Sequence, residues 1–202
     1  MKHDSSSAGA PSPRGRRPGH RDTRERIREA ARELFLADGY RDVTMRSIAA
    51  AAGVDVALVS YYFGSKNGVF SAAMSLPVSP IELLDVALEG DPDTLAERLL
   101  RALLAAWDDP TVGVPLQTAA SRAIGETALS ELVAEMVERE IVAKIAERLP
   151  GPEPYERAAI FVTQMSGVIF HRYLLRVEPI ASMPVEEIVR RLVPSLRSTL
   201  EI

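Results

Sequence analysis

The stretch TMRSIAAAAGVDVALVSYYFGSK, Thr44–Lys66, predicts two short helices joined by a tight turn. Thr44 is a good N-cap for the first helix, and Gly53 supplies the turn. The small Ala49 stands where two helices must approach closely, and Val59 anchors the second helix. This spacing is typical of a helix-turn-helix, whose second helix enters the major groove of DNA.

The same stretch resembles the tetracycline-repressor (TetR) family of regulators. That family's pattern runs Thr, any residue, Arg, then Ile-Ala, Ala-Gly-Val, Tyr-x-Phe and Ser-Lys. The chain matches the pattern at Thr44, Arg46, Ile48, Ala49, Ala52, Gly53, Val54, Tyr61, Phe63, Ser65 and Lys66. The upstream segment with Ala30, Leu34, Phe35 and Gly39-Tyr40 is similar to the family's first helix. The resemblance covers residues 21–74, and the later residues match only in helical character and length.

The resemblance implies a two-fold dimer with one recognition helix for each DNA half-site. It places the DNA contacts at Thr44, Arg46, Val56, Ala57, Leu58, Ser60, Tyr61, Tyr62 and Lys66. Three of these, Val56, Ala57 and Leu58, have no hydrogen-bonding side chain, so base readout would rest on thymine methyls, Arg46 and DNA shape. Tyr62 has two interpretations, a DNA contact or a core residue.

Charge is divided unevenly along the 202 residues. Residues 1–76 hold 12 Lys or Arg against 8 Asp or Glu, and the rest hold 12 against 20. A basic N-terminal third fits a polyanion partner, although a solvated charged face would have the same composition. Residues 1–20 are rich in Ser, Pro, Gly and Arg and predict a disordered arm. That arm is either idle or reaches DNA through Arg14, Arg16 and Arg17.

Several classes of protein are excluded by what the sequence lacks. There is no cysteine for disulfide or thiolate chemistry. No apolar run approaches the roughly 18 residues of a membrane span, and no secretory signal opens the chain. We therefore predict a cytoplasmic protein with no membrane partner. Because no nucleophile elbow, phosphate-binding glycine loop, metal-ligand spacing or Glu-x-x-His pair is present, we predict no enzyme, cofactor or metal site.

Helical periodicity continues on both sides of the quoted stretch, and no segment predicts a strand. A first helix is expected to start at Asp22 or Thr23 and to end at Gly39. Pro77 and Pro80 mark a boundary, so we predict an all-α protein with a helix-turn-helix domain over 21–76 and a larger helical domain over 77–202. The later helices are expected over 66–76, 81–88, 94–107, 115–124, 129–149, 155–176 and 184–200, the last kinked or split at Pro194.

The larger domain is expected to dimerise and to bind a small-molecule effector. The apolar helices over 129–149 and 155–176 are either both internal or self-complementary surfaces. In the TetR family two late helices form the dimer interface, so the resemblance favours self-complementary surfaces. The predicted interface residues are Met136, Ile141, Phe161, Met165, Val168 and Tyr173. The candidates for effector contact, each also compatible with a core role, are Trp107, Gln117, Thr118, Arg122, Gln164 and His171.

Together these features predict a ligand-responsive transcriptional regulator, expected to be a repressor. Its partners would be a double-stranded DNA operator, a second copy of itself and a small-molecule effector. The effector would favour a conformer whose two recognition helices no longer fit successive major grooves. The alternative is a helical scaffold or interaction protein with a vestigial helix-turn-helix, which the absence of duplex-specific binding would favour.

Overall fold

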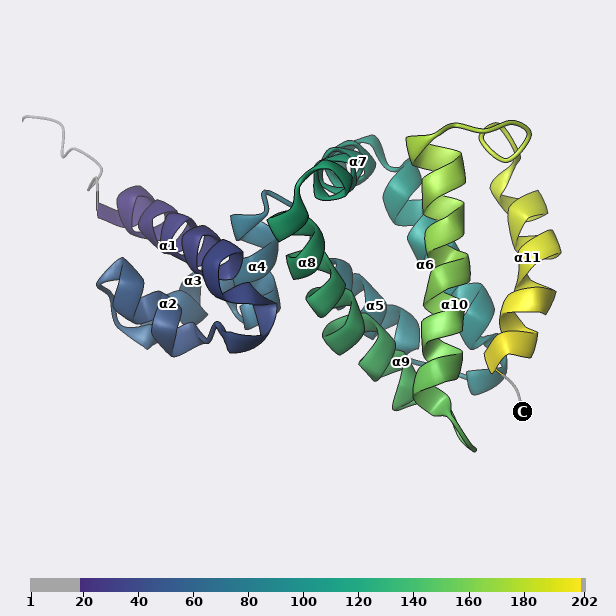
Figure 1. The fold of residues 1–202 in the computed structure, drawn as a ribbon, viewed down its shortest axis with the longest axis horizontal. Coiled ribbons are helices and arrows are strands. Elements are labelled where there is room, and N and C mark those ends of the chain that lie inside the picture. Colours follow the sequence, from purple (N-terminus) through teal and green to yellow (C-terminus); the bar gives the residue numbers. More distant parts are fainter. Residues whose placement is uncertain (1–18, 201–202) are drawn as a thin grey trace, which may run out of the picture.

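A computed structural model of the chain describes residues 19–200, and every regular element in this range is a helix (Figure 1). The all-α fold predicted from the sequence is therefore confirmed. Residues 1–18, which make up most of the predicted basic arm, lie outside the described residues. No helix in the described range is both long and apolar enough to cross a membrane.

The N-terminal part consists of four helices: α1 (Gly19–Asp42), α2 (Met45–Ala52), α3 (Val56–Phe63) and α4 (Lys66–Ala73). Helix α1 starts before Asp22 or Thr23, because no residue between Gly19 and Thr23 breaks a helix, and Asp22 then lies in its first turn. A carboxylate is favourable there because it faces the positive end of the helix dipole. Helix α4 ends at Ala73 and not at Leu76. Ser75, just beyond its end, takes a positive φ of 59°.

Local capping explains where α2, α3 and α4 begin. The Thr44 hydroxyl accepts the Ser47 N–H at 3.0 Å, and the Ser47 hydroxyl accepts the Thr44 N–H at 2.9 Å, a complete capping box. Asp55 accepts the Ala57 N–H at 2.7 Å at the start of α3. Ser65 caps α4 in the same way. Each cap was expected from the sequence, because it joins residues only two or three positions apart.

The remaining helices form the larger part of the molecule. They are α5 (Pro80–Leu88), η1 (Pro92–Thr94), α6 (Leu95–Asp108), α7 (Pro110–Gly125), α8 (Thr127–Met136), η2 (Val137–Val142), α9 (Ala143–Ala146), α10 (Pro154–Ile169), η3 (Phe170–Leu174) and α11 (Val185–Leu200). Elements η2 and η3 are π-helical turns that continue α8 and α10. The predicted helices over 129–149 and 155–176 thus each contain a change in hydrogen-bonding register.

At two prolines the structure differs from the prediction, in where α7 begins and in the expected split of the last helix. Helix α7 begins at Pro110 and runs through Pro115, because Asp109 caps it by accepting the N–H groups of Thr111 at 2.7 Å and Val112 at 3.3 Å. The last helix is not split at Pro194, and α11 is one element from Val185 to Leu200. In both helices tertiary packing outweighs the local cost of proline.

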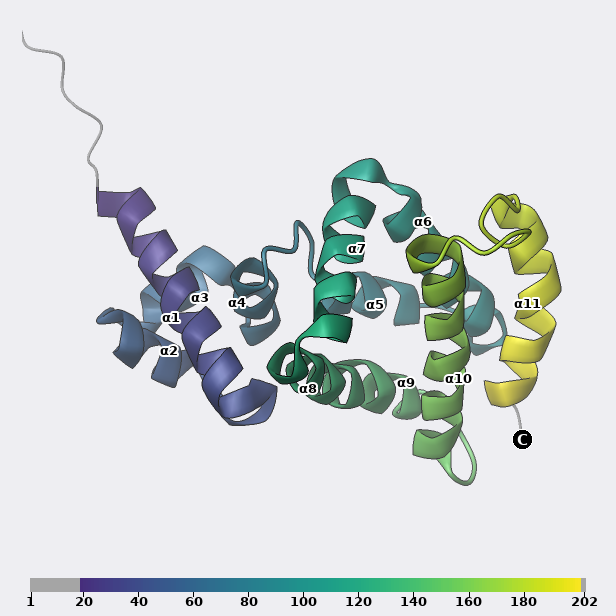
Figure 2. The ribbon, with the colours of Figure 1, turned by 45° about the horizontal axis from the view of Figure 1, so that its top comes forward.

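Helix α8 joins the two parts of the molecule. Figures 1 and 2 both place α8 beside α1, and α10 beside α11 at the far end. The core under α1–α4 contains Ile27, Phe35 and Val59, and it is completed by Leu132 and Met136 of α8. A second core lies among α5, α6, α9, α10 and α11. The N-terminal helices are therefore packed directly on the helix that borders the second part.

Candidate nucleic-acid interface and effector cavity

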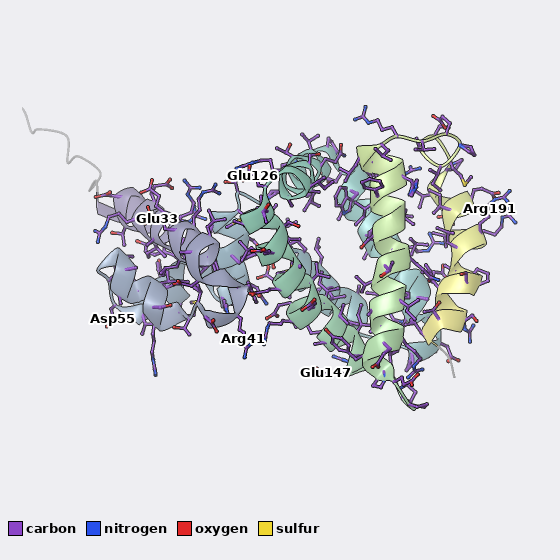
Figure 3. The ribbon with its side chains drawn as sticks, in the orientation of Figure 1. Glu33, Arg41, Asp55, Glu126, Glu147 and Arg191 are labelled. Atoms are coloured by element: carbon purple, nitrogen blue, oxygen red, sulfur yellow. The ribbon has the colours of Figure 1, made fainter. Side chains whose placement is uncertain are left out.

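The outer face of α2 and α3 carries most of the predicted DNA contacts. Val59 is fully buried and fixes α3 to the core. The side chains exposed on the opposite face are Thr44, Arg46, Val56, Ala57, Leu58, Ser60 and Tyr61. In Figure 3, Asp55 at the start of α3 lies at the opposite end of the molecule from Arg191 of α11. The helix-turn-helix thus presents an exposed face at one end of the molecule.

The adjacent tyrosines have different surroundings. The Tyr61 side chain is 75% exposed, whereas Tyr62 is half-buried and packs against the core of the N-terminal helices. Their ring centroids lie 5.2 Å apart in an edge-to-face arrangement. Tyr61 is therefore the more accessible of the two, and Tyr62 has a packing role whatever else it contacts.

Lys66, the first residue of α4, is half-buried. Its Nζ lies 4.3 Å from the centroid of the Tyr40 ring and 3.4 Å from the Arg41 carbonyl oxygen, to which it donates a hydrogen bond. Burial lowers the pKa of Lys66, partly against the opposing effect of the Glu140 charge. The ammonium group is thus held near the end of α1 by groups of the same chain, while Arg46 on α2 is exposed.

Two further arginines of the basic segment stabilise the helix-turn-helix, a role that the sequence did not indicate. The Arg26 guanidinium donates to the Ala52 carbonyl oxygen at 2.5 Å, which ties α1 to the end of α2. The Arg24 guanidinium lies 5.2 Å from the centre of the Phe63 ring. The charge count had related these arginines to a polyanion partner, not to packing within the chain.

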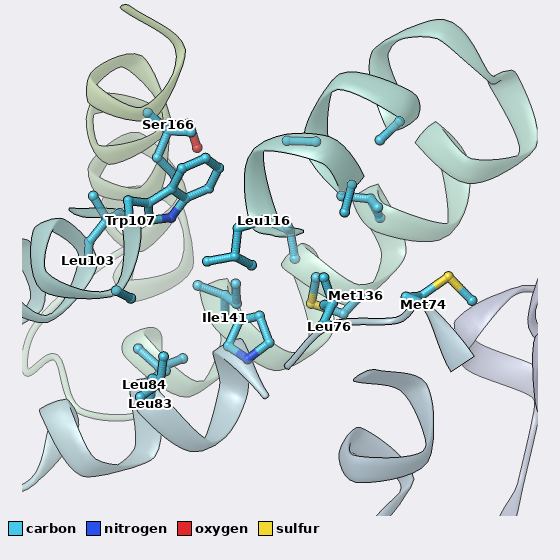
Figure 4. Close-up of a pocket in the computed structure, with 18 of the residues that line it drawn as sticks. Met74, Leu76, Leu83, Leu84, Leu103, Trp107, Leu116, Met136, Ile141 and Ser166 are labelled. Carbon is cyan, nitrogen blue, oxygen red and sulfur yellow. The ribbon is translucent and has the colours of Figure 1, made fainter. Parts of the chain in front are cut away.

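A cavity of about 540 Å³ lies between the N-terminal helices and the larger part of the molecule (Figure 4). Its lining comes from α1, α4, α5, α6, α7, α8, η2, α10 and η3 and from the segment after α4. Most of the lining is aliphatic or aromatic. The polar lining residues are Arg32, Trp107, Arg122, Ser130 and Ser166.

The structure separates the predicted effector contacts into two groups. Trp107 and Arg122 line the cavity. The other four, Gln117, Thr118, Gln164 and His171, are not among its lining residues. Three of them bond elsewhere: the Thr118 hydroxyl donates to the Val114 carbonyl at 2.9 Å, Gln164 accepts from Thr199 at 3.2 Å, and His171 Nδ1 lies 2.8 Å from the Gly167 carbonyl oxygen. Arg32 was missed because it belongs to α1, outside the domain in which an effector site was sought.

The predicted dimer-interface residues are mostly internal to one chain. Five of the six are buried in the cores described above: Met136, Phe161, Met165, Val168 and Tyr173. The sixth, Ile141, is half-buried and lines the cavity. A side chain such as Phe161, 1% exposed, therefore offers almost no surface to a partner. Helix α10 instead exposes Tyr155, Ile160 and Thr163.

A polar cluster joins the N-terminal helices to α8 and η2. The Arg41 N–H donates to Glu135 Oε2 at 3.0 Å. The Tyr40 hydroxyl donates to Asn67 Oδ1, and Asn67 Nδ2 donates to Glu140 Oε2 at 3.2 Å. Burial raises the pKa of Tyr40, and the negative charge of Glu140 raises it further. The start of α4, at Lys66 and Asn67, is thereby linked to the π turn η2.

Within residues 19–200, no group of three or more His, Cys, Asp or Glu side chains is arranged to hold a metal ion. Two places in the described part are candidate sites. One is the exposed face of α2 and α3, and the other is the largely apolar cavity.

Comparison with known proteins gives matches over both parts of the chain. The family model described as bacterial regulatory proteins, tetR family, matches residues 27–73. The model described as tetracyclin repressor-like, C-terminal domain, matches residues 93–200, which is more than half of the chain.

Individual relatives are aligned over shorter segments. The chain is 36% identical over 89 residues to TtgW of Pseudomonas putida, an uncharacterized HTH-type transcriptional regulator, and 36% identical over 88 residues to the HTH-type transcriptional regulator SrpR of the same species. These segments are 44% of this chain in each case, and only 63% of TtgW and 39% of SrpR. The crystal structure of a TetR-family regulator from Streptomyces coelicolor is 30% identical, covers 92% of this chain and 98% of its own, and has a TM-score of 0.49.

Proposed function

Because the chain belongs to the tetracycline-repressor (TetR) family of bacterial regulatory proteins, we propose that it is a ligand-responsive transcriptional repressor that binds a two-fold symmetric DNA operator as a homodimer. The observation that carries the proposal is the exposed face of α3, which stands on a buried Val59 anchor and beside the exposed Arg46. A rigid helix with one free face fits the major groove.

In this proposal the contacts on α2 and α3 have separate tasks. Arg46 and Tyr61 hold the protein on the sugar-phosphate backbone or reach a base edge. Val56, Ala57 and Leu58 contact thymine methyl groups, because they offer apolar surface and no hydrogen-bonding side chain. The operator would therefore combine thymines facing α3 with a shape that admits the helix.

The proposed dimer uses the outward face of α10 together with α11. Ile160 is 54% exposed, and two small residues, Thr163 and Gly167, follow it at helical spacing on the same side. The Thr163 hydroxyl is already bonded to the Ala159 carbonyl at 2.9 Å, so its methyl group can face a partner. Small residues allow two copies of α10 to cross closely about a two-fold axis.

The cavity is the proposed effector site. Its volume of about 540 Å³ lies within the usual range for small-molecule sites. It touches α1 and α4 on one side and α6 and α10 on the other, so a bound molecule would contact both the DNA-binding helices and the proposed dimer helix. An effector that prefers one relative placement of these parts would shift the spacing of the two recognition helices.

The test is selection of duplexes from a random library by the full chain, followed by fluorescence anisotropy of the enriched sequence at several salt concentrations. We expect a two-fold symmetric site, bound by two chains and at least a thousandfold tighter than a scrambled duplex. A library that yields no common sequence, with equal weak binding to all duplexes, would contradict the proposed function.

A further inference from the structure

We propose that the cavity binds an apolar monocarboxylate whose charged head lies at Arg32 of α1 and Arg122 of α7. This inference rests on the proposed function and deepens it, because it names the chemical class of the effector. Three properties of the cavity support it: an apolar wall, lining residues with charges of one sign only, and an arginine to which the described residues give no hydrogen bond or ion pair.

The wall of the cavity selects an apolar body. It contains side chains of Leu, Ile, Val, Met, Ala, Phe and Trp from eight helical elements, and its uncharged hydrogen-bonding groups are the hydroxyls of Ser130 and Ser166 and the indole of Trp107. A ligand with many polar groups would lose hydration here and regain few hydrogen bonds. A hydrocarbon chain or ring system has no such cost and gains by leaving water.

The charges of the cavity select an anion. Arg32 and Arg122 are its only charged lining residues, and no Asp, Glu, Lys or His is among the lining side chains. A cationic ligand would lie near two positive charges with no carboxylate among the lining residues to neutralise it. A single carboxylate would instead meet the planar guanidinium groups, which bind it through paired hydrogen bonds.

The two arginines differ in how available they are. Arg32 is half-buried, and the described residues give it neither a hydrogen bond nor an ion pair. Arg122 pairs with Glu126 four residues later, at 3.2 Å, and both side chains are about half exposed. An exposed pair of this kind contributes little, so a ligand carboxylate can compete for Arg122. Arg32 is the stronger determinant because no partner among the described residues has to be displaced from it.

The position of Arg32 gives the charged head a regulatory consequence. Helix α1 carries Arg32 on the cavity, while Ile27 and Phe35 of the same helix belong to the core that also contains Val59 of α3. A carboxylate held by Arg32 therefore acts on the helix that supports the recognition helix. In Figure 4 Met74, from the N-terminal part, and Trp107, from α6, lie on opposite sides of the cavity, so the ligand body would extend toward Trp107.

Trp107 also makes the test direct, because it is the single tryptophan of the chain and lines the cavity. We would titrate the full chain with dodecanoate, dodecanamide and dodecylammonium below their micelle concentrations and follow Trp107 fluorescence. These probes share one alkyl chain and differ in the charge of the head. We expect dodecanoate to bind at least tenfold tighter than dodecanamide, and dodecylammonium to bind more weakly than either.

Variants then assign the preference to the arginines. In Arg32→Gln the preference for dodecanoate over dodecanamide is expected to fall at least fivefold, and in the double variant with Arg122→Gln it should disappear. Dodecanamide affinity should stay within twofold of the unsubstituted chain, which shows that the cavity is still folded. Arg148→Gln, an exposed arginine outside the cavity lining, is the matched control and should retain the full preference.

Two results would overturn the inference. One is dodecanamide or dodecylammonium binding as tightly as dodecanoate, and the other is a preference for dodecanoate that survives in the double variant. Absence of binding by all three probes, in a preparation that still binds its selected duplex, would overturn the ligand class and leave the DNA-binding proposal standing. A preparation that selects no duplex at all would instead contradict the proposed function.

Discussion

At the scale of single residues, Gly39 ends the regular part of α1 with a backbone that other residues avoid, φ 78° and ψ 173°. The turn brings Tyr40 into contact with Phe35 and Phe70, whose ring centroids lie 5.9 and 5.3 Å from that of Tyr40. It also brings the Arg41 N–H onto Glu135 of α8. One glycine thus shapes both the aromatic core and the contact between the two parts of the molecule.

Gly39→Ala is expected to destabilise the fold by about 1–3 kcal/mol, the usual cost of holding a non-glycine residue in this region. An added Cβ would lie 2.9 Å from Glu135 Oε2, so Glu135 would also have to move away from the Arg41 N–H. Urea unfolding measures the change. Gly125→Ala is the control, because nothing lies within 4 Å of its Cβ position. Equal unfolding midpoints for Gly39→Ala and the unsubstituted chain would refute the argument.

Arg46→Ala is expected to weaken binding to the selected duplex and to lower the salt slope of log K by about 1 if Arg46 contacts one phosphate. The side chain is exposed on α2, so the fold should be unaffected. Anisotropy titrations over a series of salt concentrations give the slope. The control is Arg148→Ala, which removes an equal charge far from α2 and α3. An unchanged slope in Arg46→Ala would remove this residue from the interface.

At the scale of elements, the rod formed by α8, η2 and α9 faces two regions at once. Met136, Val137 and Ile141 line the cavity. Glu135 and Glu140, on the same rod, hold the N-terminal helices through Arg41 and Asn67. The π turn between Val137 and Val142 inserts an extra residue into the helical register, and such turns are frequent at functional sites. The rod is therefore the element through which cavity and DNA-binding helices are in contact.

Glu140→Ala is expected to loosen α4. The substitution leaves Asn67 Nδ2 without its acceptor at a half-buried position, which costs about 1 kcal/mol. We expect faster amide hydrogen exchange in α4, where the tie to η2 is lost, and little change in α3. Glu138→Ala removes an exposed carboxylate from the same π turn and is the matched control. Identical exchange in the two variants would mean that the Asn67–Glu140 contact does not hold α4.

At the scale of the whole molecule, the two proposed activities occupy opposite ends. The exposed face of α3 lies at one end and the pair α10 and α11 at the other, with the cavity between them (Figures 1 and 4). A dimer formed at the α10 end would set the distance between two recognition helices. A change in the packing between the cavity and α1 would then alter the distance between the two recognition helices more than the shape of either one.

Ile160→Arg is expected to convert the dimer to monomers, because two copies of a large new side chain of like charge would meet near the two-fold axis. Sedimentation equilibrium gives the mass, and binding to the selected duplex should weaken because half-sites are then bound singly. Val86→Arg, at a 71% exposed position on α5, serves as the control. A persistent Ile160→Arg dimer would place the interface on another face.

The sequence by itself determined the local features of this protein. The starts of α2, α3 and α4 follow from Thr44, Asp55 and Ser65, and the turn between α2 and α3 follows from Gly53, which has a positive φ of 62°. The exposed and buried faces of α3 follow from helical periodicity. All of these depend on residues within one or two helical turns of each other, so their spacing along the chain carries the information.

Only the tertiary structure decided which partner each apolar face meets. Periodicity identified Phe161, Met165 and Val168 as an apolar face, but only the structure shows that packing against α9, η2 and α11 of the same chain buries them. The same holds for the cavity, to which Arg32 comes from α1, far in sequence from Trp107. An apolar stripe has the same pattern whether it covers a core, a cavity or a partner, because hydrophobic burial has no directional preference. Which of these an apolar stripe covers is therefore fixed only by the packing of all the helices.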